Sequence, residues 1–253
     1  MNFMAVFRKE MLEQWRTYRL LIVAAVLAAF GLASPLLAKF TPEMLKAIPD
    51  VPAELLAAIP APTVADAITQ YVKNMSQFGI LLALLMTMGV VVQEKERGTA
   101  AFFLTRPVSR GTFLLAKFAA LTVTFAVSLT IASLGCWYYT YVLFEPLAWG
   151  PFLALNGLML VVFLAYVALS LLGSTIARTQ GVAVGLAFFA LIVVGGIGSL
   201  PRLGDYFPGR LFGWGATLMM DGSGTAWPAF GISLGIIVIA LLVACIIFRR
   251  QEV

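Results

Sequence analysis

The stretch QEKERGTAAFFLTRPVSRG, residues 93–111, is the longest polar interruption of a chain that is otherwise apolar. It places two acidic and four basic side chains around a small apolar cluster. Apolar clusters that are rimmed by charge mark surfaces on which another protein docks. The alternative is a loop beside a membrane, whose bases meet lipid phosphates while its phenylalanines lie in the interface. Either way, the stretch predicts a contact surface.

The order of residues in this stretch predicts a short helix between two longer ones. Gly98 breaks the preceding helix, Thr99 can cap a new one, and Pro107 forbids its continuation. We therefore expect a helix over Thr99–Thr105, set crosswise to its neighbours. The apolar residues that it presents are Phe102, Phe103 and Leu104.

The composition is that of an integral membrane protein. Of the 253 residues, 61% are hydrophobic and 11% are charged, with a mean hydropathy of +0.97, whereas soluble domains are about half apolar and a quarter charged. One water-facing globule cannot bury so much apolar surface, so lipid must be the solvent. Cys136 and Cys245 lie in apolar runs and are expected to be small buried hydrophobes. Because the chain has no histidine, we expect no metal site and no catalytic residue.

Six charge-free windows are each long enough for one membrane crossing: residues 20–38, 74–93, 118–144, 146–177, 179–201 and 222–248. With Thr112 as the expected cap of the third helix, we place the six spans at 20–38, 74–93, 113–136, 152–174, 180–200 and 228–248. The predicted fold class is an all-α integral membrane protein of one domain, residues 1–253, with both termini on the same side.

Residues 1–19 are predicted to form an amphipathic helix in the membrane interface. Their apolar residues recur at intervals of three or four, and these are Phe3, Phe7, Met11, Trp15 and Tyr18. A straight extension of the first span is the alternative.

Two segments, 39–73 and 201–227, are expected outside the cytoplasm. The first holds a small repeat, EMLKAIP and ELLAAIP, which predicts two short amphipathic helices. Thr63 is the expected cap of the helix that enters the second span. The second segment is too apolar for a free loop, and it either lies in the interface or dips back between the helices.

The positive-inside rule sets the orientation. With cytoplasmic termini in a cell membrane, the inner segments hold twelve of the seventeen basic residues. These are Arg8, Lys9, Arg16, Arg19, Lys95, Arg97, Arg106, Arg110, Lys117, Arg178, Arg249 and Arg250. The net charge of +5 is therefore explained by orientation rather than by nucleic-acid binding.

The windows contain no Asp, Glu, Lys, Arg or His, which argues against a proton-driven transporter and an intramembrane hydrolase. Most Ser and Thr residues in them are expected to support helix packing. Ser128 and Asn156 are the candidates for a pathway or a subunit contact. The chain also has no G-x-x-x-x-G-K-[ST] loop, so any ATPase must be another polypeptide.

The pattern E-x-E-R-G-T-x-x-x-x-L-x-x-P-V-S-R, followed by a lysine in the next span, resembles the signature of ABC-2 type transporter permease subunits. The matching residues are Glu94, Glu96, Arg97, Gly98, Thr99, Leu104, Pro107, Val108, Ser109, Arg110 and Lys117. The layout of six spans with their flanking segments resembles the family over the whole length.

The resemblance implies a permease that pairs with a second copy or a paralogue, with membrane lipids around it, and with two cytoplasmic ATPase subunits. ATP and Mg would bind to the ATPase, and this chain would bind no cofactor and would be no enzyme by itself. The short helix would be the coupling helix, with Glu94, Glu96 and Arg97 holding its hinge and Phe102 and Phe103 as anchors. The implied ATPase-coupling residues are Glu94, Glu96, Arg97, Gly98, Thr99, Phe102, Phe103, Leu104, Arg106, Pro107, Ser109 and Arg110. Arg178, between spans four and five, would be a second cytoplasmic contact.

The function expected from these features is ATP-driven export of a lipid-like, peptide or drug-like amphipathic substrate. The alternative is a membrane anchor for an ATPase complex that serves signalling or envelope remodelling without transport.

Overall fold

In a computed structural model, the protein is described over residues 3–46, 61–96, 109–220, 222 and 224–251. This part of the chain is helical, with no strand. The helix expected over residues 99–105 and the second copy of the repeat, residues 54–60, lie outside the described residues.

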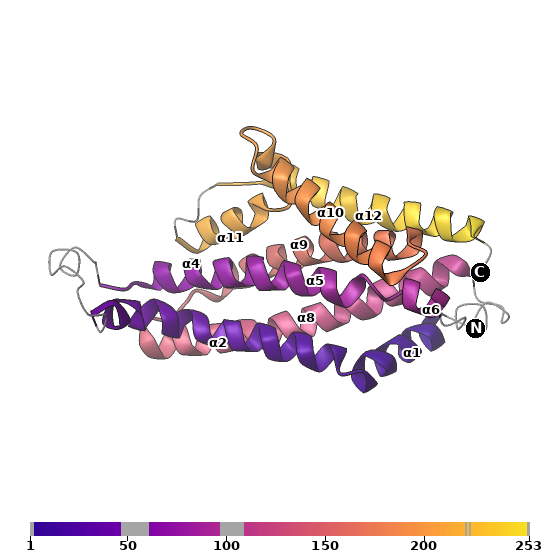
Figure 1. The fold of residues 1–253 in the computed structure, drawn as a ribbon. Helices are drawn as coiled ribbons and strands as arrows, with labels where there is room; N and C mark the ends of the chain where they lie inside the picture. The colour runs from indigo at the N-terminus through magenta and orange to yellow at the C-terminus, as the bar shows by residue number, and fades with distance from the viewer. Residues whose placement is uncertain (1–2, 47–60, 97–108, 221, 223, 252–253) are drawn as a thin grey trace.

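The helices lie along an elongated bundle (Figure 1). In chain order they are α1 (Phe3–Arg16), α2 (Arg19–Lys46), α4 (Val64–Asn74), the π-helical turn η1 (Met75–Gly79), α5 (Ile80–Thr87), α6 (Val92–Glu96), α8 (Arg110–Leu143), α9 (Trp149–Ile176), α10 (Gln180–Gly198), the 3₁₀ turn η2 (Gly204–Tyr206), α11 (Arg210–Met220) and α12 (Trp227–Arg250).

Six helical segments of the described chain are long and apolar enough to cross a membrane. They are Arg19–Met44, Val64–Glu96, Arg110–Leu143, Trp149–Ile176, Gln180–Gly198 and Trp227–Arg250. The predicted all-α fold with six spans is therefore confirmed. Helix α1 and the end of α12 lie at the same end of the bundle, which we call the terminal end (Figure 1). The opposite end, where α4 and α9 begin, we call the loop end.

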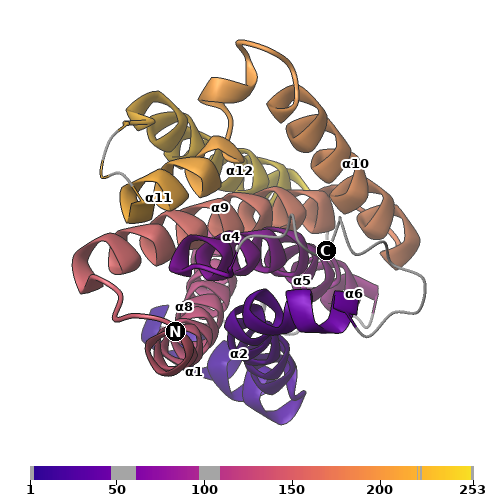
Figure 2. The ribbon, with the colours of Figure 1, turned by 90° about the vertical axis from the view of Figure 1, so that its left-hand side faces the viewer.

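Helix α9 is the centre of the packing. Seen along the bundle, α10, α11 and α12 lie on one side of it, and α2 and α8 lie on the other (Figure 2). The core between these helices holds large side chains without contact to solvent, which are Leu27, Tyr71, Phe125, Met159 and Phe163. By contrast, α10 and α12 bury few of their residues, and their outer faces are apolar, as expected where lipid is the solvent.

A sharp turn separates α1 from α2. The backbone of Tyr18 takes a φ of +58°, a conformation that side chains with a Cβ rarely adopt. The first helix is therefore separate from the first span and not its straight extension.

The segment that enters the second span begins as predicted. Thr63 caps α4, and its backbone N–H donates to Asp66 Oδ2 at 2.8 Å, as in a capping box. On the other side of the gap, α2 runs through Pro42 to Lys46, so the first copy of the repeat begins inside α2.

The apolar residues of segment 201–227 are explained by α11, which packs against α9 and α4 rather than forming a free loop. Leu211 is fully buried, and Gly215 lies so close to Leu155 that a Cβ there would come within 2.5 Å of Leu155 Cδ1. Trp214 Nε1 donates to the carbonyl of Gly224 at 2.8 Å, which ties α11 to the chain that enters α12.

The closest approach of α2 and α8 depends on Gly31. A Cβ at this position would lie 2.4 Å from the carbonyl oxygen of Ala132, a backbone atom that cannot move without its helix. Gly185 in α10 has nothing within 4 Å of the same position.

We therefore expect Gly31→Ala to destabilise the protein by about 1–3 kcal/mol, because it overpacks two helix backbones. Gly185→Ala is the matched control, and it should be neutral or gain up to about 1 kcal/mol of helix propensity. Both are measured as the fraction of monodisperse protein after heating in detergent. Equal losses of the two variants would contradict the close approach.

Candidate functional site

A buried ionic cluster lies at the terminal end, centred on Lys117 of α8. The side chain of Lys117 is 1% exposed, and its Nζ lies 2.9 Å from Glu10 Oε2 and 2.9 Å from Glu94 Oε1. Glu10 belongs to α1 and Glu94 to α6, and both are buried. One ammonium group thus joins three helices that are far apart in the sequence.

Lys9 and Glu13 of α1 extend the cluster towards solvent. Lys9 Nζ lies 2.8 Å from Glu94 Oε1, 2.8 Å from Glu13 Oε2 and 2.9 Å from Glu10 Oε1. Three carboxylates close enough to share one cation are therefore gathered around the Lys9 ammonium group. We name these five residues, Lys9, Glu10, Glu13, Glu94 and Lys117, the ionic cluster.

The charges of α1 are stabilised by one another. Burial by itself lowers the pKa of Lys9, but the carboxylates of Glu10 and Glu94 outweigh it and raise that pKa above its ordinary value. Burial also raises the pKa of Glu13, and the hydrogen bond from Lys9 outweighs it and lowers that pKa. Both shifts favour the charged form, so the ammonium group of Lys9 and the carboxylate of Glu13 are both charged at neutral pH.

Helix α1 therefore turns polar residues towards the bundle. Its buried positions are Val6, Glu10 and Gln14, and Thr124 Oγ1 of α8 donates to Gln14 Oε1. The predicted apolar stripe does not pack against the bundle, since its members Phe3, Trp15 and Tyr18 are exposed. Glu10 and Gln14 are not among the residues predicted to be functional, although Val6, Glu10 and Gln14 follow one another at intervals of four and so share one helix face.

The described residues on either side of positions 97–108 contact other helices. On one side, Lys95 Nζ donates to the carbonyls of Thr175 and, at 3.1 Å, Ala177, at the end of α9. Glu96 Oε1 accepts the backbone N–H of Gln180 at 3.0 Å, where α10 begins. A cation at a carbonyl end and an anion at an N–H end both complement the helix dipole.

On the other side, Arg110 holds the end of α12. Its Nη1 donates to the carbonyls of Phe248 at 2.9 Å and Arg249 at 3.0 Å, and also to that of Gln251. These carbonyls have no partner within their own helix, so one guanidinium group satisfies several of them. The side chain of Gln251 reaches further and donates to Thr175 of α9 at 3.1 Å.

Helix α8 begins one turn earlier than expected. Ser109 is its cap, and Ser109 Oγ accepts the backbone N–H of Thr112 at 3.1 Å. The prediction that Thr112 caps this helix was wrong, because the extended conformation of Ser109 already lets its hydroxyl reach the free N–H groups.

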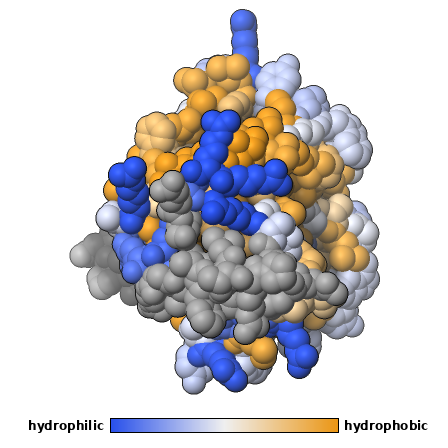
Figure 3. Space-filling view, turned by 90° about the vertical axis from the view of Figure 1, so that its right-hand side faces the viewer, coloured by the Kyte–Doolittle hydropathy of each residue, from blue (hydrophilic) through white to orange (hydrophobic). Residues whose placement is uncertain are grey.

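The structure brings together only part of the predicted site. Glu94, Glu96, Ser109 and Arg110 lie at the terminal end, and Arg178 is exposed beside them in the turn between α9 and α10. The other predicted coupling residues lie outside the described residues, and these are Arg97, Gly98, Thr99, Phe102, Phe103, Leu104, Arg106 and Pro107. Figure 3 looks onto this end, where hydrophilic side chains gather among a largely hydrophobic surface.

Asn156 and Ser128 lie far from this cluster along their helices. Asn156 accepts the hydroxyl of Tyr71 at 2.7 Å and donates to the carbonyl of Phe152 at 2.8 Å. It also lines an apolar groove of about 260 Å³ between α8 and α9, together with Thr130 and Ser133. Ser128 is fully buried and is not among the residues that line this groove.

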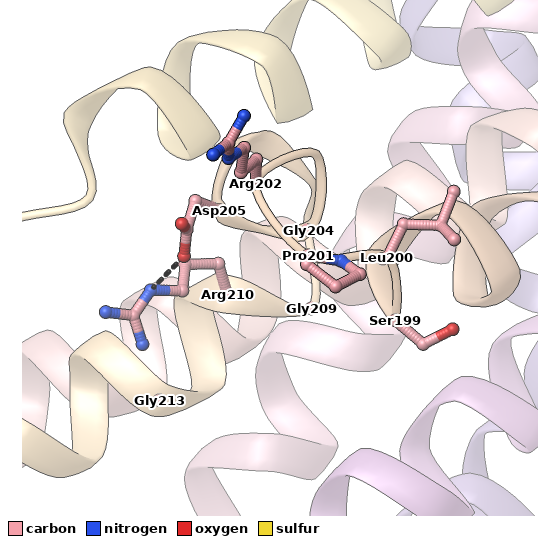
Figure 4. Close-up of a pocket in the computed structure, with 10 residues that line it drawn as sticks. Ser199, Leu200, Pro201, Arg202, Gly204, Asp205, Gly209, Arg210 and Gly213 are labelled. Atoms are coloured by element: carbon pink, nitrogen blue, oxygen red, sulfur yellow. Dashed lines mark ion pairs between the residues drawn. The ribbon is translucent and has the colours of Figure 1, made fainter.

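In a cavity of about 410 Å³ at the loop end, the charged side chains do not point towards a common centre. It lies between α10 and α11, and its charged residues are Arg202, Asp205 and Arg210 (Figure 4). Asp205 and Arg210 form an exposed ion pair at 3.4 Å, while Arg202 points away from them. Exposed pairs of this kind contribute little energy, so this cavity is not our candidate site.

The fold and the site define the class of protein: a multi-pass membrane protein with a buried ionic cluster at the terminal end of the bundle. Residues 4–253 match the family described as ABC-2 family transporter protein, so the chain belongs to this family. It is a permease membrane subunit without a catalytic domain of its own.

Two relatives from Bacillus subtilis (strain 168) are similar to the chain. One, named an uncharacterized transmembrane protein, YxlG, is 25% identical over 252 residues, and the aligned region covers 98% of this chain and 98% of that protein. The other, named a putative transport permease, YvfS, is 24% identical over 194 residues, which are 72% of this chain and 78% of that protein.

Removal of Lys117 should strongly destabilise the fold. Lys117→Met leaves Glu10 and Glu94 buried with too little positive charge, and breaking a buried pair costs about 3–5 kcal/mol. The matched control is Lys73→Met, at an exposed position of α4, which should change the stability by less than about 0.5 kcal/mol. Thermal unfolding of the purified permease measures both.

A second substitution separates charge from packing. Adding Glu94→Gln to Lys117→Met leaves Lys9 with fewer carboxylates to neutralise, so the double variant should be more stable than Lys117→Met alone. If the stability losses of Lys117→Met and Glu94→Gln simply add in the double variant, the broken ion pair is not the cause of the instability of Lys117→Met.

The capping role of Arg110 predicts a local effect. Arg110→Gln should raise amide hydrogen exchange at the end of α12 by about tenfold, because hydrogen bonds to a charged group are worth about 1.5–3 kcal/mol. Arg250→Gln is the control, since the exposed Arg250 makes no such bond among the described residues. Exchange that is unchanged in Arg110→Gln would remove the assignment.

Proposed function

We propose that the chain is the membrane half of an ATP-driven exporter, with its terminal end in the cytoplasm. Twelve of the seventeen basic residues belong to segments on that side, which supports this orientation. ATP and Mg would bind to a separate ATPase subunit, and two permeases, identical or paralogous, would pair above two ATPases.

The observation that carries the proposal is the attachment of segment 97–108. The residues just before it contact four helices: Glu94 contacts α1 and α8, Lys95 contacts α9, and Glu96 contacts α10. The residue that begins α8 after it, Arg110, contacts α12. A push on this segment therefore reaches most of the bundle through short polar contacts.

In this mechanism the segment receives the push from the ATPase. Phe102 and Phe103 are the proposed apolar anchors in a groove of the ATPase, and Arg178, at the same end of the bundle, is a second contact. When the ATPase dimer closes, the ionic cluster would carry the displacement to α1 and α8, and Arg110 would carry it to α12. The spans would then rock and move the substrate outward.

The proposed substrate is an amphipathic molecule, such as a lipid, a peptide or a drug-like compound. The charge-free windows offer no counter-ion for an inorganic ion. The groove between α8 and α9 is apolar with a few hydroxyl groups and the amide of Asn156, which suits a mostly apolar molecule with one polar group.

The anchor role of the two phenylalanines is testable with the complex of permease and ATPase. Phe102→Asp with Phe103→Asp should abolish co-purification of the ATPase, because burying a carboxylate at an apolar contact costs more than the roughly 2–7 kcal/mol that a neutral polar group without a hydrogen bond costs. The control is Leu203→Asp with Tyr206→Asp, two exposed apolar residues at the loop end, which should leave co-purification unchanged.

Unchanged co-purification and turnover of the first double variant would refute the coupling assignment. The exporter is then distinguished from a non-transporting anchor in liposomes. Substrate-stimulated ATP hydrolysis is expected of the exporter alone.

A further inference from the structure

An apolar groove lies between α1 and α8, beside the face of α1 that carries Glu10 of the ionic cluster. It has a volume of about 430 Å³ and is lined by Phe3, Met4, Phe7, Phe118, Ala119, Thr122 and Val123. Thr122 is the only residue among these with a polar side chain, and its hydroxyl donates to the carbonyl of Phe118 within its own helix. The groove therefore offers contacts to an apolar ligand and no hydrogen bond that would hold a polar one in it.

The surface around the groove continues into the lipid-facing side of α8. Leu115, Val127 and Ile131, on the same helix, are exposed apolar residues, and a spanning helix exposes such residues to acyl chains. On α1, the exposed Met4 and Trp15 extend the apolar surface along the helix. Hydrocarbon is thus the solvent next to the groove.

A positive charge lies at the rim of the groove. Arg8 follows Met4 by four residues, so the two are neighbours on one helix face. Arg8 is exposed and forms no ion pair with the described residues, whereas the neighbouring Lys9 is held by three carboxylates. An apolar groove with a cation at its rim complements a molecule that has a hydrocarbon chain and an anionic head.

We propose that this groove binds an anionic phospholipid of the inner leaflet, with one acyl chain between α1 and α8 and the phosphate at Arg8. The proposal rests on the orientation argued above, which places the groove at the cytoplasmic side. Basic residues near the membrane surface attract anionic lipids, and amphipathic helices at the interface respond to lipid composition.

A lipid bound in this groove would also affect the ionic cluster. Helix α1 carries the groove residues Phe3 and Phe7 on one side and Glu10 on the next, which pairs with Lys117. A lipid that bridges α1 and α8 holds α1 in the position in which that pair forms. The lipid composition of the inner leaflet would thereby regulate how well the coupling segment is attached.

The test measures lipid binding to the purified permease alone, without an ATPase. Native mass spectrometry with an equal mixture of phosphatidylglycerol and phosphatidylcholine reports the lipid that stays bound. We expect a preference for phosphatidylglycerol, and Arg8→Gln should reduce that preference about fivefold. Ala119→Phe, at a half-buried position, should fill the groove and reduce the retention of both lipids.

The control is Arg16→Gln, an exposed arginine on the same helix that lies two turns further on and away from the groove. It should leave the preference unchanged. An equal loss in Arg8→Gln and Arg16→Gln would show diffuse attraction to the helix, and a second permease copy released by Ala119→Phe would show a protein contact; both overturn the proposal. Because no ATPase takes part, failure here is distinct from failure of the exporter assignment.

Discussion

The buried ammonium group of Lys117 is the constraint on which the terminal end of the molecule depends. A lysine that is 1% exposed requires carboxylates, and the chain supplies Glu10 from α1 and Glu94 from α6. Removing an ion from water costs several kcal/mol, and only close, hydrogen-bonded partners offset this cost. One charge therefore joins α1 and the end of the second span to α8.

At the same end of the bundle, the carbonyl groups at the ends of α9 and α12, which have no partner within their own helices, also receive hydrogen bonds. Lys95 and Arg110, which flank segment 97–108, donate to these carbonyls. The charged residues around the segment thus have partners inside the protein as well as at its surface. A sequence rich in bases beside a membrane is compatible with lipid contact alone, but these bonds show that two of the bases are structural.

The sequence predicted the features that depend on local pattern: the six spans, the separate first helix and the cap at Thr63. It did not predict with which residues the charged side chains form ion pairs and hydrogen bonds. The sequence places Lys95 among the bases on the cytoplasmic side and gives Glu10 no role, because the partners of both residues lie on helices that come later in the chain. Phe3, Phe7 and Trp15 predict an interfacial helix, and the face of α1 that packs on the bundle is the one that carries Glu10 and Gln14. In lipid, an apolar face needs no protein partner, whereas Glu10 and Gln14 do.

The arrangement of the ionic cluster also bears on why charges are kept there at all. Apolar residues of similar size are often as stable as a buried ion pair, so stability alone does not explain it. Glu94 is shared between the ammonium groups of Lys9 and Lys117, which belong to different helices. A shared carboxylate keeps one partner while the other moves away, so α6 can shift against α8 without ever leaving a buried charge unpaired. Tight apolar packing has no such intermediate, because a displaced side chain leaves a cavity. In the mechanism proposed above, shared ion pairs would therefore suit a moving attachment to α1 and α8 better than a close-packed contact.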